Sequence, residues 1–167
     1  VVKEKGSVRY GLFTVRHIKD DWYLEVPDSL LGRMMLAVTR FTSTPQGFRK
    51  FSGEEVNRSA IYLEQYGPKA IFMREYVQSE LANPDDRIAI SLKQSTTDPI
   101  IVKFDVIGRN PKTKDQLINV TKWIMSDNKV TSFTASDRTA MGVTNVQADR
   151  TFIDSIKTFP INVEIQS

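Results

Sequence analysis

Apolar and polar residues alternate along much of this chain, in short runs separated by turn-forming residues. Residues 13–16 and 22–26 both follow this period of two, and an aspartate pair at 20–21 lies between them. Such alternation is typical of strands with one buried face, because successive side chains of a strand point to opposite sides of the sheet. The pattern therefore predicts a β-hairpin over residues 13–26.

The same reasoning predicts two further hairpins and a strand between the first two hairpins. The hairpins span residues 56–78 and 100–120, with turns at 66–69 and at Asn110-Pro111. Residues 33–41 are rich in Met, Leu and Val. A nearly continuous apolar run of this length predicts a central strand that is buried on both faces.

Short helices are predicted between these strands. The expected segments are a single turn at 27–32, a helix at 87–94, a turn beginning at Thr121 that holds Trp123 and Ile124, and a last helix over 149–157 before a closing strand at 161–165. Residues 88–90 (IAI) are equally compatible with a strand. Residues 127–148 are polar and predict an irregular excursion. Together these elements predict an α+β fold, mainly antiparallel β-sheet built from hairpins with short helices, in a single domain over residues 1–167.

The chain has few side chains of the types that most often act in catalysis or bind zinc. The chain has one histidine, His17, and no cysteine. Histidine and cysteine are the commonest neutral-pH bases, nucleophiles and zinc ligands, so a His/Cys zinc site cannot be assembled within this chain. Carboxylate chemistry remains open. We interpret His17 as a structural residue, and we predict no catalytic residue and no metal ligand in this chain.

Charge and hydropathy disfavour two classes of partner. The net charge is +3, but residues 1–83 carry 12 Lys and Arg against 10 Asp and Glu, and residues 84–167 carry 11 against 10. Nucleic-acid binding needs clustered positive charge, so we predict no nucleic-acid partner. No run reaches the length of about 18 apolar residues that a membrane-spanning helix needs, so we also predict no membrane span in this chain.

The long loop at 42–53 carries the best candidates for a recognition surface. Loops of about a dozen residues are uncommon in compact domains unless they have a function. Phe48, Arg49 and Phe51 lie on this loop, and aromatic residues with arginine are typical anchors of binding interfaces. The alternative is that the two phenylalanines fix the loop onto the core of the domain.

Neighbouring acidic residues are candidates for acid-base catalysis, in the case of the glutamates, and for calcium binding, in the case of the aspartates. Glu54 and Glu55 follow the loop and complete our candidate binding residues, but neighbouring residues of a strand point to opposite faces and would not converge on one substrate. A structural role, such as accepting from loop amides or pairing with Arg49 or Arg58, is the favoured interpretation. The aspartate pairs at 20–21 and 85–86 lack the spacing of an EF-hand, and turn formation explains them better than calcium binding.

Several segments resemble one known family. These are residues 11–15 (GLFTV), 22–33 (WYLEVPDSLLGR), 38–40 (VTR), 44–48 (TPQGF), 53–57 (GEEVN) and 150–164 (RTFIDSIKTFPINVE). Together they resemble the domain of uncharacterised function that precedes the catalytic domain in zinc-dependent metalloproteases of Bacteroidetes. The resemblance extends over nearly the whole chain.

The resemblance implies a fragment of a longer, metzincin-like protease. In that family the zinc is held by an H-E-x-x-H helix downstream of this domain, and no such motif occurs here. Zinc is therefore expected in the downstream catalytic domain, with no cofactor in this chain. The implied partners are that catalytic domain and a polypeptide substrate. The implied location is the periplasm, the outer membrane or the secreted fraction.

Four functions stay open at this point. The leading one is a non-catalytic accessory domain that packs on the peptidase domain or assists substrate binding. A variant is an inhibitory prosegment, although a cysteine switch is excluded because the chain has no cysteine. The second is an independent β-rich module that binds protein or glycan through the 42–53 loop. The last is a small carboxylate hydrolase.

Overall fold

A computed structural model describes residues 6–44, 46–47, 50–77, 97–142, 144–145 and 147–167. The main sheet contains β1 (Ser7–Arg9), β2 (Thr14–Ile18), β3 (Asp21–Val26), β4 (Met35–Arg40), β5 (Glu55–Tyr66), β6 (Ala70–Glu75), β7 (Ile100–Arg109) and β8 (Gln116–Asn119). A separate hairpin contains β9 (Ser155–Thr158) and β10 (Val163–Gln166). The helical segments are η1 (Asp28–Leu30), α2 (Thr121–Met125), α3 (Ala135–Met141) and η2 (Ala148–Arg150).

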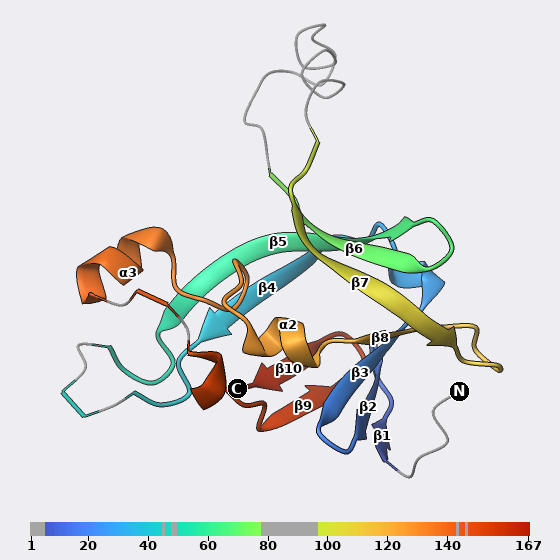
Figure 1. The fold of residues 1–167 in the computed structure, drawn as a ribbon, viewed down its shortest axis with the longest axis horizontal. Coiled ribbons are helices and arrows are strands. Elements are labelled where there is room, and N and C mark those ends of the chain that lie inside the picture. Colours follow the sequence, from blue (N-terminus) through green and yellow to red (C-terminus); the bar gives the residue numbers. More distant parts are fainter. Residues whose placement is uncertain (1–5, 45, 48–49, 78–96, 143, 146) are drawn as a thin grey trace, which may run out of the picture.

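The eight strands pair in the order β1-β2-β3-β8-β7-β6-β5-β4, and every described pairing is antiparallel. The sheet curls into a half-barrel, with α2 in the hollow of the curl (Figure 1). The β9–β10 hairpin lies beside β2, where the amide of Leu12 donates to the carbonyl of Phe159 over 2.7 Å. The three hairpins predicted from period-two alternation, at 13–26, 56–78 and 100–120, are present.

The core fills the inside of the curl. Ile71, Ile118 and Ile156 come from β6, β8 and β9 and are almost fully buried. Trp22, from β3, belongs to the same cluster. Burial of each large aliphatic side chain contributes about 1.5–3 kcal/mol, which outweighs the weak intrinsic preferences of short strands.

The prediction of an α+β fold is wrong. Strands account for 45% of the structure and helices for 12%, so the protein is a mainly antiparallel β fold with short helices. The largest single error is the helix expected over 149–157, where the chain forms the η2 turn and then β9. Phe152 is 68% exposed while Ile156 is fully buried, so the apolar spacing there does not mark one buried helical face. Pairing with β10 decides the structure instead.

The strand predicted as central is an edge strand. β4 pairs only with β5 among the described strands and ends the sheet. Its side chains alternate between half-buried and exposed, and Leu36 is 62% exposed. An apolar run can therefore belong to an edge strand with one solvent-facing side, which the sequence composition alone does not reveal.

The helical predictions have mixed outcomes. The turn at 27–32 appears as η1, and the turn beginning at Thr121 appears as α2. The excursion at 127–148 contains α3, whose first turn is capped by Thr134, since that hydroxyl accepts from the amide of Asp137. Gly142 ends α3 in the left-handed conformation. The predicted helix at 87–94 lies outside the described residues.

Candidate functional site

Strand β7 has two halves with different neighbours. Along the half at 100–105 it pairs with β6, and along the half at 106–109 it pairs with β8. Within the described part of the chain, no strand pairs with residues 100–105 on the side opposite β6. Half of the backbone donors and acceptors of a strand point to each side, so this half of β7 presents an unpaired edge.

The edge is unpaired because the chain turns away from β7 after β8. The amide of Val120 donates to the carbonyl of Trp22 over 3.0 Å. The hydroxyl of Thr121 then accepts from the amide of Trp22 over 2.7 Å, in a buried position. These two bonds tie the start of α2 to β3, so the chain separates from β7 and opens a gap.

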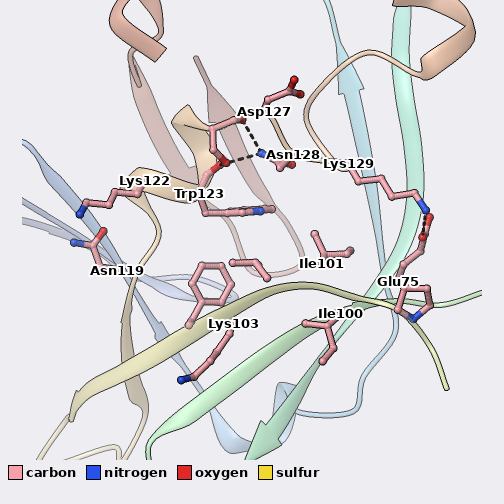
Figure 2. Close-up of a pocket in the computed structure, with 14 residues that line it drawn as sticks. Glu75, Ile100, Ile101, Lys103, Asn119, Lys122, Trp123, Asp127, Asn128 and Lys129 are labelled. Carbon is pink, nitrogen blue, oxygen red and sulfur yellow. Dashed lines mark hydrogen bonds and ion pairs between the residues drawn. The ribbon is translucent and has the colours of Figure 1, made fainter. Parts of the chain in front are cut away.

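A cavity of about 530 Å³ occupies this gap. Its residues come from the end of β6, the free half of β7, the end of β8, α2 and the loop after α2. They are Glu75, Pro99, Ile100, Ile101, Val102, Lys103, Phe104, Asn119, Lys122, Trp123, Ser126, Asp127, Asn128 and Lys129. Figure 2 shows the indole of Trp123 between α2 and β7, with β6 on the far side of β7. We call this cavity the β7–α2 groove.

The floor of the groove is apolar, and its two aromatic side chains pack on each other. The rings of Trp123 and Phe104 meet edge to face, with centroids 5.7 Å apart. Edge-to-face pairs of this kind stabilise beyond the area that they bury. The indole nitrogen of Trp123 is buried and has no hydrogen-bond partner in the described structure. A buried donor without an acceptor is uncommon, because leaving it unpaired costs about 1–3 kcal/mol.

The loop after α2 is held in place by the side chain of Asn128. Its amide nitrogen donates to the carbonyl of Trp123 over 2.9 Å, and its oxygen accepts from the amides of Val130 and Thr131, both over 3.0 Å. Asn57 of β5 adds a bond of 2.5 Å to the carbonyl of Lys129. The loop that walls the groove is therefore ordered before any ligand binds.

A second cavity of about 560 Å³ adjoins the groove. Both cavities are lined by Glu75 and residues 127–129, and the second continues to Phe133 and Arg138. Lys129 forms an ion pair with Glu75 at the boundary between them, which Figure 2 shows at the end of the groove away from Lys122. The two cavities therefore share this ion pair as part of their lining.

The charged groups around the two cavities are mostly paired. Asp127 accepts two hydrogen bonds from the guanidinium of Arg138, which raises the pKa of that arginine. Lys103 lies 3.3 Å from Asp105 in an exposed position, and such pairs contribute little. Lys122, among the described residues, has no acidic partner. The unpaired positive charge on the rim is therefore that of Lys122, which lies on the same side of β7 as Trp123 (Figure 2).

The structure places the described members of the sequence-predicted site, Phe51, Glu54 and Glu55, outside the lining of the groove. Phe48 and Arg49 lie outside the described residues. Phe51 is 70% exposed. Glu54 accepts from Lys50 over 2.5 Å and from the amide of Phe51, so it closes the loop locally.

Glu55 also makes a structural contact. It accepts from Arg58 over 2.7 Å and 3.0 Å, and Arg40 lies 3.4 Å away. The hydrogen bonds from Arg58 hold the pKa of Glu55 below its ordinary value. Glu54 and Glu55 therefore sit in separate local networks and do not form a convergent acid-base pair.

The described residues do not fit a zinc site. No three His, Asp or Glu side chains among them converge as ligands would. The ring of His17 stacks on Trp22 with centroids 4.0 Å apart, which uses it for packing. No helix in the described part of the chain is both long enough and apolar enough to cross a membrane.

Comparison with known proteins assigns two segments to families. Residues 53–167 match a domain of unknown function, DUF5117, and residues 1–44 match another, DUF5118. The chain belongs to the DUF5117 family. No curated protein and no solved structure matches it.

The two matched segments are interleaved in one sheet. The DUF5118 segment supplies β1–β3 on one flank and β4 at the opposite edge. The DUF5117 segment supplies β5–β8 between them, through the pairs β3–β8 and β4–β5. The β7–α2 groove lies wholly within the DUF5117 segment.

Sequence reasoning missed the groove residues Lys122, Trp123 and Asn128. The sequence predicts Trp123 as part of the turn that begins at Thr121. The structure packs it against the core, and its ring also lines the cavity. The one available signal was the placement of a tryptophan in a short helix directly after a strand.

Proposed function

We propose that this chain is a non-catalytic accessory domain of a secreted or periplasmic zinc-dependent metalloprotease. It packs on the downstream peptidase domain or assists the binding of polypeptide substrate. The resemblance of residues 22–33, 53–57 and 150–164 to the domain that precedes such peptidases motivates the link. The zinc belongs to the peptidase domain in this proposal.

The observation that supports a binding role is the character of the β7–α2 groove. It has an apolar floor, an ordered wall and carboxylates that are engaged in ion pairs with Lys129 and Arg138. Ion-paired carboxylates on a rim are suited to shaping a surface, since a general acid or base needs a carboxyl group that is free to exchange protons with a substrate. The groove therefore suits holding a ligand better than transforming one.

The proposal is tested with the natural polypeptide that contains this domain. Its reading frame beyond Ser167 should encode an H-E-x-x-H helix. The separately produced peptidase domain should bind the 1–167 domain in sedimentation or calorimetry. Casein cleavage measured with and without the 1–167 domain then distinguishes a supporting role from an inhibitory one. A reading frame without a peptidase motif contradicts the proposal.

The second candidate function is an independent protein-binding module. The unpaired edge of β7 favours it, because such an edge can recruit a strand from any partner without a peptidase in the same chain. A pull-down in which the isolated domain captures partners while the peptidase domain does not bind it would favour this candidate.

A further inference from the structure

We propose that the β7–α2 groove binds an extended, acidic segment of polypeptide, which adds as a strand to the free edge of β7. This deepens the proposed function by naming the class of substrate segment that the accessory domain holds, and it rests on that function for the source of the segment.

The unpaired edge of β7 can form backbone hydrogen bonds with an extended polypeptide. Residues 102–105 pair with β6 in regular register. They therefore present donors and acceptors at the spacing of a strand on the opposite side, where β8 does not pair with them. Only another extended chain offers complementary amides and carbonyls at the same repeat, which is the basis of strand addition at sheet edges. A sugar or a compact cofactor does not match this repeat.

The floor of the groove accommodates alternate side chains of such a segment. In an added strand, every second side chain points to one face. On the face that α2 covers it would meet Phe104 and Trp123, which pack on each other and line the cavity. A volume of about 530 Å³ lies within the range of about 300–1,000 Å³ found for ligand pockets, so it can hold these apolar side chains.

The charge of the rim selects an acidic segment. Lys122 has no acidic partner within the described structure, and Lys103 has only an exposed contact with Asp105. In Figure 2 Lys122 lies on the Trp123 side of β7 and Lys103 points to the other side of the strand, and both are remote from the Lys129–Glu75 ion pair. A carboxylate on the bound segment would complete this rim, whereas a lysine would be repelled.

The groove is also pre-formed, which favours binding. The Asn128 bonds fix the loop wall, and the bonds of Val120 and Thr121 to Trp22 fix α2. Association then costs the loss of rigid-body freedom and the ordering of the ligand, with little further cost for ordering the groove itself.

The experiment measures binding of a fluorescein-labelled peptide of alternating glutamate and valine to the whole 1–167 chain by fluorescence anisotropy. The companion peptides are the same sequence with every backbone amide N-methylated, and alternating lysine and valine. The protein variants are Lys122→Glu and Lys112→Glu. Lys112 is exposed at the β7–β8 turn and outside the groove lining, so its variant makes the same charge change away from the rim.

The expected result is binding of the Glu/Val peptide to wild type and to Lys112→Glu alike. Lys122→Glu should bind it about fivefold more weakly, because one ionic contact becomes a repulsion. The N-methylated peptide should lose binding, since it cannot donate to the edge of β7, and the Lys/Val peptide should bind more weakly than the Glu/Val peptide.

Three results would overturn the inference. They are the absence of Glu/Val peptide binding to wild type, equal binding of the N-methylated peptide, and equal effects of Lys122→Glu and Lys112→Glu. No peptidase is present in this assay. Its failure would therefore remove the strand-addition site while leaving the link to a metalloprotease to the reading-frame test.

Discussion

The 42–53 loop and the β7–α2 groove differ in how their residues are brought together. The described contacts of the loop and its base are mostly local, such as Lys50 with Glu54 and Arg58 with Glu55. The groove joins residues from β6, β7, β8 and α2, and its wall depends on bonds such as that from Asn57 to Lys129. A local pattern in the sequence can reveal the first kind of site, and only the folded sheet creates the second.

The largest expected difference between the two regions concerns their aromatic residues. Replacing Trp123 with Ala should lower the free energy of unfolding by about 3 kcal/mol, because its ring packs on Phe104 and on the core. Replacing the exposed Phe51 with Ala should change it by no more than about 0.5 kcal/mol. Urea denaturation followed by circular dichroism measures both. Equal losses would mean that the loop is packed as firmly as the groove.

A smaller difference is expected for the polar anchors. Asn128→Ala should cost about 2 kcal/mol, since it leaves the amides of Val130 and Thr131 and the carbonyl of Trp123 without their partner. Ser52→Ala removes one exposed bond to the carbonyl of Thr42 and should cost about 0.5 kcal/mol. Thermal unfolding measures the stability of both variants. The account is contradicted if Ser52→Ala lowers the stability as much as Asn128→Ala does.

The smallest effect is expected for the ion pair between Glu55 and Arg58, just after the 42–53 loop. Arg58 lowers the pKa of Glu55, so the pair stabilises the fold above the pKa that Glu55 has in the unfolded chain. This contribution is lost as the pH falls through the lowered pKa. The wild type should therefore exceed Glu55→Gln slightly in urea midpoint at neutral pH, and the two should coincide in strong acid. Salt at about 1 M should shrink the neutral-pH difference, and a difference that grew in acid would contradict the assignment.

The hairpins were predictable because their information is local. Period-two alternation with a turn between the runs specifies β2–β3, β5–β6 and β7–β8 directly. The position of β4 at the sheet edge was not predictable, because it depends on which strands pair beyond their sequence neighbours. The prediction of a helix over 149–157 was wrong for the same reason, because the pairing of β9 with β10 overrides the apolar spacing around Ile156.

The candidate site was predictable only in its local part. Glu54 and Glu55 were expected to make structural contacts with loop amides or with an arginine, and they contact the amide of Phe51 and Arg58. The groove depends on the separation of β7 from β8, which the bond from Val120 to Trp22 produces across nearly one hundred residues of sequence. No pattern within a short window of residues contains that information.

The most direct measurement is a titration of the isotopically labelled domain with the Glu/Val peptide, followed by the backbone amide resonances in NMR spectra. If the groove is the binding site, the largest shifts should fall on residues 100–105 and 119–129, with little change at 50–55. Shifts concentrated at 50–55, with the β7 and α2 amides unmoved, would contradict the account and return the binding role to the loop.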